Sequence, residues 1–405
     1  MKRFKDFSMA MCMVVFVSLT TLAAAQPKDS TVAPKATNNI TISLLTCSPG
    51  DEVWSLYGHT ALRFQDSTQG IDLAINYGIF DFRQNNFVLR FVFGLTDYEM
   101  GIEPFQMFMM EYARNGRGVI EQRLNLTNEE KMAIATAISK NYETANRTYR
   151  YNYFYDNCTT RARDIIINNV DGHVEYPFTT YKTSYREMIH QWNIKHRWAR
   201  FGNDLLLGFG ADSHTSQAQQ QFLPDTLRKD FASGFIINPT GMRRPLVDST
   251  FEVLKPNSFN IHTETDIWDK LSPRCTFCIF FTIILVSSLL EWKRKKPFWL
   301  VDVTLLTLDG LAGLILLAMV FSQHPTVNFN LQILLLNPLS IIFAYSTINQ
   351  QVKGFCHWYW KLYMSLIVLF LIGNIFQNYA EGMNILALIL MTRCVLNICT
   401  LNAKK

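Results

Sequence analysis

The sequence has few side chains arranged to hold a metal ion, a nucleotide or a nucleic acid. Its eight cysteines and eight histidines show no spacing typical of a metal site, because the pair Cys275 and Cys278 has no second pair to complete one. A glycine-rich phosphate loop is lacking, and the net charge of +5 is not gathered into a basic stripe with interleaved aromatic residues. We therefore expect no cofactor and no nucleic-acid partner.

The N-terminus is typical of a cleavable export signal. Three basic residues within the first five precede an apolar stretch at 9–22 and three alanines at 23–25. Residues 1–25 are thus predicted to be a signal peptide, followed by a flexible leader at 26–38 and an extracytoplasmic domain at 39–265. The alternative is an uncleaved anchor helix.

Five apolar stretches predict a membrane domain at 272–402. A transmembrane helix needs about 20 residues, with a range of about 17–25. Basic residues follow the first, third and fifth stretches, and the positive-inside rule places these connections in the cytoplasm. The N-terminal domain is then outside, in agreement with the signal peptide. The five stretches are 275–291, 298–321, 331–347, 359–377 and 383–401.

Two charged residues lie inside these apolar stretches. Asp309 is midway along the second stretch and Arg393 is midway along the fifth. A lone charge at that depth costs about 2.5–3.5 kcal/mol, so we expect the two to pair within the bundle. The alternative is that the two side chains point separately into water-filled cavities. His324, in a loop predicted to be outside, is either a plain interfacial residue or part of a lipid-facing site.

The extracytoplasmic domain mixes strands and helices. Alternating apolar residues predict strands at 40–46, 59–64, 71–77 and 149–155. Thr127 and Glu130 form a capping-box pattern at the start of a helix predicted over 126–142. A second helix is predicted to follow the last strand after a sharp turn, to begin at about Cys158 and to end near Gly172.

Cys158 is the residue best placed for chemistry. A thiolate at a helix N-terminus is stabilised by the helix dipole and by free N–H groups, which can lower its pKa from about 8.5 toward about 3.5–7.5. The thiolate is the nucleophilic form. Two alternatives stay open: a disulfide with Cys47, the other cysteine of this domain, or a role in packing alone.

His59 is the candidate partner of this thiol. It begins a predicted strand, from which its side chain can reach a neighbouring turn. A purely structural histidine is the alternative. Asn76, on the adjacent strand, is the first candidate to orient the imidazole, with Glu52 and Asp81 as rivals. The predicted catalytic residues are therefore Cys158, His59 and Asn76.

Segments in both halves of the chain resemble the Lnb-type lipoprotein N-acyltransferase family, and its Bacteroidetes branch most closely. Together these segments span most of the chain after the signal peptide. They are TCSPGD at 46–51, YGHTALR at 57–63, NYGIFDF at 76–82, NYFYDNCTTR at 152–161, FGNDLLLG at 201–208, QFLP at 221–224, FSQHP at 321–325 and LNPL at 336–339.

The resemblance implies an α+β, papain-like extracytoplasmic domain, permuted so that histidine precedes cysteine, and then five transmembrane helices. It implies a multi-pass protein of the bacterial inner membrane with its catalytic domain in the periplasm. Such enzymes move an acyl chain from the sn-2 position of a lipoprotein's diacylglyceryl group to the α-amine of its N-terminal cysteine. By this likeness Cys158 forms the thioester and His59 is the general base. Diacylated lipoprotein N-termini and membrane lipids would be the partners.

Two other functions stay open from the sequence. The first is a cysteine peptidase or amidase that acts on cell-wall peptide, although a single membrane anchor would suffice for that role. The second is a non-enzymatic envelope sensor or assembly factor, in which Cys47 and Cys158 form a disulfide.

Overall fold

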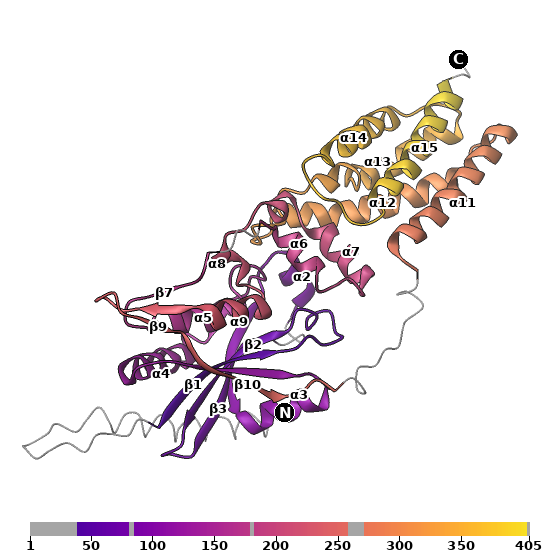
Figure 1. The fold of residues 1–405 in the computed structure, drawn as a ribbon. Helices are drawn as coiled ribbons and strands as arrows, with labels where there is room; N and C mark the ends of the chain where they lie inside the picture. The colour runs from indigo at the N-terminus through magenta and orange to yellow at the C-terminus, as the bar shows by residue number, and fades with distance from the viewer. Residues whose placement is uncertain (1–38, 81–84, 179–181, 258–270, 403–405) are drawn as a thin grey trace, which may run out of the picture.

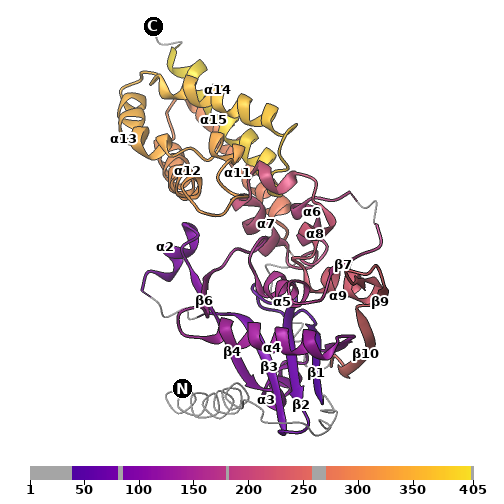
Figure 2. The ribbon, with the colours of Figure 1, turned by 90° about the vertical axis from the view of Figure 1, so that its left-hand side faces the viewer.

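The computed structural model describes residues 39–80, 85–178, 182–257 and 271–402. The predicted signal peptide at 1–25 and leader at 26–38 lie outside the described residues. A domain built on a β-sheet occupies one end of the molecule, and a group of apolar helices occupies the other (Figure 1). Short helices from the middle of the chain lie between them, as the view in Figure 2 also shows.

The main sheet has seven strands in the order β10-β5-β1-β2-β3-β4-β6, and neighbouring strands are antiparallel. The strands predicted at 40–46, 59–64 and 71–77 are confirmed as β1, β2 and β3. A small sheet of three strands lies beside it. The strands are β1 (Ile40–Cys47), β2 (His59–Asp66), β3 (Ile71–Ile79), β4 (Asp97–Pro104), β5 (Val119–Leu124), β6 (Thr148–Arg150), β7 (His173–Glu175), β8 (Phe235–Ile237), β9 (Arg243–Pro245) and β10 (Val247–Leu254).

Helices cover both faces of the main sheet. Successive side chains of a strand point to opposite faces, and the central strands have apolar residues on each face. On one face, Phe108 and Tyr112 of α3 pack against Leu45 and Ala61. On the other face α4, α5 and α9 bury Leu44, Leu62 and their neighbours. The predicted capping box at the start of α4 is present. These helices are α3 (Phe105–Arg114), α4 (Asn128–Tyr142), α5 (Cys158–Ile167) and α9 (Pro224–Ser233).

The segment around α5 differs from the prediction at both ends. The strand expected at 149–155 is wrong, since β6 stops at Arg150. Beyond it, the backbones of Asn152 and Asp156 exchange two hydrogen bonds of 2.9 Å. These bonds close a tight turn, so the chain is not extended there. At the other end α5 stops at Ile167, before Gly172. There the backbone N–H of Asp171 donates to the Glu130 side chain of α4 at 2.8 Å. This N–H is therefore bound to α4 and does not continue the helical hydrogen bonds of α5.

Four helical segments in the described part of the membrane half are long and apolar enough to cross a membrane. The stretch predicted at 359–377 forms α14, which has 15 residues and is shorter than the usual span. The last residues of that stretch lie beyond α14 and contact the middle of the chain, where the Gln377 amide donates to the Leu207 carbonyl at 3.2 Å. The helices are α11 (Pro273–Arg294), α12 (Trp299–Val320), η2 (Leu331–Leu334), α13 (Leu339–Val352), α14 (Tyr359–Gly373) and α15 (Met383–Asn402).

The expected pair of Asp309 and Arg393 is wrong. Arg393 instead donates two hydrogen bonds of 2.7 Å to Asp302 and pairs with Glu291 at 2.7 Å. Asp302 lies two helical turns before Asp309 on the same face of α12, so Arg393 meets the first carboxylate and not the second. Asp309 accepts from the backbone N–H of Asn337 at 3.2 Å and from the Ser340 hydroxyl.

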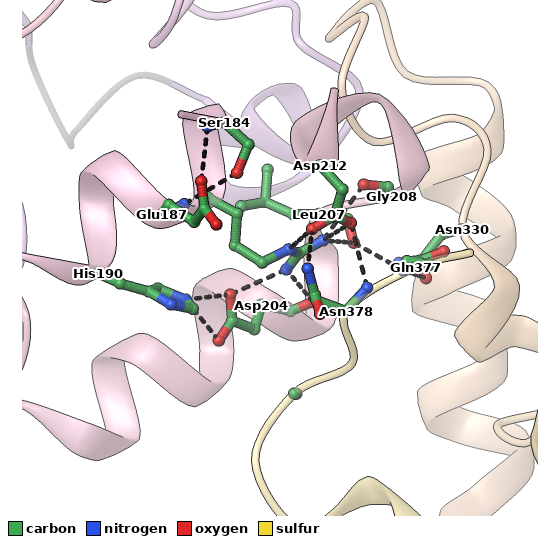
Figure 3. Close-up of polar contacts among 12 residues, drawn as sticks. Ser184, Glu187, His190, Asp204, Leu207, Gly208, Asp212, Asn330, Gln377 and Asn378 are labelled. Carbon is green, nitrogen blue, oxygen red and sulfur yellow. Dashed lines mark hydrogen bonds and ion pairs between the residues drawn. The ribbon is translucent and has the colours of Figure 1, made fainter. Parts of the chain in front are cut away.

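A buried polar junction joins the two halves of the molecule. Arg186 of α6 (Tyr185–His190) is 1% exposed and donates to Asp204 and Asp212, both at 2.9 Å. Asp212 also accepts from the Asn378 amide of the membrane half at 2.8 Å. Figure 3 shows Asp204 and Asp212 beside Gln377 and Asn378. The junction thus links α6 and α7 (Arg197–Leu206) to the membrane helices.

The loops at this junction agree with the orientation inferred from charge. The loops at 322–330 and 378–382 carry no lysine or arginine and were expected outside. Gln323 of the first loop donates its backbone N–H to Phe93 of the sheet domain at 3.0 Å. In the second, Glu381 pairs with Arg197. Both predicted outside loops therefore face the N-terminal domain.

Candidate active site

Cys158 is the first residue of α5 and is held there by a side-chain cap. The Asn157 side chain accepts the backbone N–H groups of Thr159 and Thr160, each at 2.9 Å. Its amide donates in turn to the Phe222 carbonyl at 2.9 Å, which fixes the cap to the next segment of the domain. The N–H of Cys158 itself is not used by the cap. The thiol thus lies at the positive end of the helix, as the sequence predicted.

His59 reaches Cys158 from the first position of β2. The two ionisable groups lie close enough for each to shift the pKa of the other. The Thr60 hydroxyl contacts that of Thr159 at 3.1 Å, which ties β2 to the first turn of α5. Gly58 precedes the histidine with φ of +81°, where a β-carbon would lie 2.6 Å from the Cys47 carbonyl oxygen. Only glycine fits the turn that delivers His59 to the helix end.

Asn76 of β3 lies on the other side of the imidazole. Its Oδ1 is 3.0 Å from His59 Nε2, and its Nδ2 donates to Glu103 at 2.8 Å. Because the amide nitrogen is committed to a carboxylate, Oδ1 must accept, so His59 Nε2 carries a proton. Nδ1 is then the nitrogen left to take a proton from the thiol. The structure brings together all three residues that the sequence proposed.

The two rivals of Asn76 do not share this position. Glu52 is exposed and accepts a hydrogen bond from the Ser55 hydroxyl at 2.8 Å. Asp81 lies outside the described residues. Glu103 of β4, by contrast, is not among the residues predicted from the sequence, because only the pairing of β3 with β4 brings it beside Asn76. Burial raises the pKa of Glu103 to about 7.

The charges at the site favour a thiolate. Burial acts to raise the pKa of Cys158, but the charge and hydrogen bond of His59 outweigh it and lower the pKa to about 7. Burial conversely acts to lower the pKa of His59, and Cys158 raises it. Each group thus stabilises the charged form of the other. A thiolate paired with an imidazolium is the form a cysteine nucleophile requires.

Cys47 has a different environment. It lies opposite His59 in the register of β1 and β2 and is 1% exposed. Both Cys47 and Cys158 are free thiols in the structure. Burial raises the pKa of Cys47 to about 12, despite a hydrogen bond from Tyr112 that lowers it. A thiol in that state is inert near neutral pH.

The pair opens into a cleft of about 450 Å³. Its lining includes three ionisable residues, Glu103, Glu111 and Arg117. It also includes several aromatic residues, among them Phe80, Tyr98 and Tyr151. The cleft can therefore hold a molecule with both a polar and an apolar part.

Two family models match the chain, one in each half. Residues 32–187 match the Lnb N-terminal periplasmic domain, and residues 263–405 match the Lnb transmembrane domain. The chain belongs to the Lnb-type family. It is accordingly a membrane protein with a periplasmic α+β domain, in a family associated with lipoprotein processing. No curated protein and no solved structure matches it.

Proposed function

We propose that this Lnb-type protein is a lipoprotein N-acyltransferase of the bacterial inner membrane. Its periplasmic domain would be a permuted papain-like domain, with His59 ahead of Cys158, and α14 would be the fifth, short membrane helix. The substrate is a diacylated lipoprotein, and the product is a lyso-form lipoprotein with an acylated N-terminus. The observation that carries the proposal is that Cys158 and His59 line one cleft together with aromatic residues, and that each shifts the pKa of the other, in a chain with apolar membrane helices.

The first half-reaction forms a thioester. The Cys158 thiolate attacks the carbonyl carbon of the sn-2 ester, and negative charge develops on the carbonyl oxygen. The Cys158 backbone N–H, at the start of α5, is a donor suited to stabilise that charge. The bond to the glyceryl oxygen then breaks, and the departing oxygen takes a proton from the His59 imidazolium. The products are an acylated Cys158, a neutral His59 and the lyso-lipoprotein.

The second half-reaction transfers the acyl group to nitrogen. The free α-amine of the lipoprotein's N-terminal cysteine attacks the thioester carbonyl, and neutral His59 accepts a proton from the amine. The carbon–sulfur bond breaks, the Cys158 thiolate leaves and an amide remains. Thiolate and imidazolium are thereby restored for the next cycle. Asn76 keeps the Nε2 proton in place through both steps, so that Nδ1 alone exchanges protons.

The deciding experiment uses the full chain in lipid vesicles with a synthetic diacylated lipopeptide. Mass spectrometry of the lipopeptide should reveal one acyl chain moved from oxygen to nitrogen with no change in total mass. Protein sampled during turnover should carry one acyl group on Cys158 that hydroxylamine removes. Cleavage of cell-wall peptide by the same preparation, with no acyl movement, would favour a peptidase and refute the proposal.

A further inference from the structure

A row of aromatic rings leads from the catalytic cleft to the outer end of the membrane half. Three of its members, Tyr151, Tyr98 and Phe80, line the cleft together with Cys158. The successive ring centroids are separated by 4.1 Å (Tyr151–Tyr98), 4.9 Å (Tyr98–Phe80), 6.1 Å (Phe80–Phe87), 6.5 Å (Phe87–Phe91) and 6.2 Å (Phe91–His324). Among these described residues, neighbouring ring centroids are never more than 6.5 Å apart.

The middle of the row belongs to α2 (Phe87–Val92), which is fixed to the end of α12. The backbone N–H of Gln323 donates to the Phe93 carbonyl at 3.0 Å. Gly94 follows with φ of +67°, and a β-carbon there would lie 3.2 Å from the Gln323 nitrogen. Figure 2 shows α2 between the strands of the sheet domain and the membrane helices. α2 therefore lies at the level where the membrane helix ends.

At that level three large apolar side chains are exposed. Leu89 is 57% exposed, Phe91 is 44% exposed and Phe321, at the end of α12, is 71% exposed. The basic residue of α2, Arg90, is bound to Asp97 at 2.6 Å and to the Leu95 carbonyl. Apolar side chains exposed at a membrane boundary are typical of a helix that contacts lipid. The apolar surface of the membrane helices thus continues along α2 toward the cleft.

We infer that this row is the path along which the sn-2 acyl chain passes from the outer leaflet to Cys158. The inference rests on the proposed function, because it names the part of the protein that binds the acyl donor. An acyl chain that leaves the bilayer loses favourable burial unless other apolar surface covers it. The aromatic row supplies such surface, while two other residues that line the cleft, Glu103 and Glu111, are suited to the polar head of the lipoprotein.

A photocrosslinking experiment tests the path without requiring turnover. The probe is a diacylated lipopeptide with a diazirine in its sn-2 chain, in vesicles that contain the full-length Cys158→Ala protein. Label should appear on the segment 85–94, and unlabelled lipopeptide should compete for it. Label confined to the membrane helices would overturn the inference. Label on this segment together with no acyl transfer by the wild-type protein would instead refute the proposed function and leave the path intact.

A kinetic experiment tests the same path with a matched pair of variants. Phe91→Asn removes one exposed ring of the row, whereas Phe251→Asn removes a ring of nearly the same exposure, 43% against 44%, on strand β10. The ratio of kcat/KM for a hexadecanoyl donor to that for a butanoyl donor should fall about tenfold in Phe91→Asn, which corresponds to about 1.4 kcal/mol. Alkylation of Cys158 by iodoacetamide serves as the check of folding. An unchanged ratio in Phe91→Asn, or an equal fall in Phe251→Asn, would overturn the inference.

Discussion

Asn76 accepts a hydrogen bond from His59 Nε2 at 3.0 Å while its own amide is bound to Glu103. These two contacts fix both the orientation and the tautomer of the imidazole. The other ring nitrogen, Nδ1, is therefore the one able to exchange protons. A single asparagine on β3 thus connects the sheet to the proton transfers that we propose at the end of α5.

Asn76→Ala should lower kcat about 10- to 100-fold and change KM little, because general acid–base catalysis contributes about 10²–10⁴-fold and part of it depends on a correctly oriented base. Acyl transfer to a synthetic lipopeptide is the measurement. The matched control is Asn39→Ala, since the Asn39 side chain donates to the Thr68 hydroxyl at an exposed position of the same domain. A similar loss in both variants would mean that Asn76 has no particular role.

The reactivity of Cys158 should follow the pKa of about 7 set by its environment. The thiolate fraction rises with pH, so the rate of alkylation by iodoacetamide should rise through pH 7 and level off above it. His59→Ala removes the charge that lowers this pKa and leaves the burial that raises it, so the midpoint should move to higher pH. A midpoint unchanged by His59→Ala would show that the histidine does not stabilise the thiolate.

Cys47 and Cys158 should respond differently to replacement by serine. Cys158→Ser should reduce acyl transfer by about 10⁴–10⁶-fold, as expected for a missing nucleophile. Cys47→Ser should keep most of the activity, because Cys47 is a buried thiol beside Tyr112 and is not among the residues that line the cleft. Both proteins should be extracted from membranes in normal amounts. Equal damage from both replacements, with an unfolding free energy lower by about 2–4 kcal/mol each, would indicate a disulfide after all.

Much of this site could be predicted because its determinants are local. Alternating residues define β1 to β3, and the turn before Cys158 is visible in the sequence as the start of a helix. The position of Glu103 could not be predicted, since it depends on how β4 pairs with β3. The partner of Arg393 was predicted wrongly for a related reason. Asp302 and Asp309 share one face of α12, and the sequence does not give the depth at which α15 meets that face.

The contrast between these two aspartates is itself testable. Asp302 is fully buried and accepts from Arg393, Asn397 and Gln351. Asp302→Asn should lower the unfolding free energy by about 3–5 kcal/mol, because it leaves a buried guanidinium short of charge compensation. Asp309→Asn should cost less, since an amide oxygen can still accept from Ser340. The yield and melting temperature of each protein in detergent are the measurements. A larger loss in Asp309→Asn would contradict the pairing.

The junction between the two halves of the molecule should depend on Arg186. Its guanidinium binds two carboxylates and also donates to the carbonyl oxygens of Leu207 and Gly208 at 3.1 and 3.2 Å. Arg186→Met keeps the apolar stem of the side chain but leaves Asp204 and Asp212 without their buried cation. Removing one partner from a buried ionic network costs about 3–5 kcal/mol. For a domain of this size that corresponds to a fall in melting temperature of about 10 °C.

Arg228→Met is the matched control for this junction. Arg228 pairs with Asp225 within α9 at 2.6 Å, and both side chains reach the solvent. Pairs of this kind are worth less than about 1 kcal/mol, so its melting temperature should stay close to that of the wild type. Limited proteolysis should in addition cut the segment 186–212 faster in Arg186→Met alone, because that segment is held against Gln377 and Asn378 through the same network. If the two arginine variants have the same melting temperature and are cut by protease at the same rate, the junction does not hold the periplasmic domain to the membrane helices.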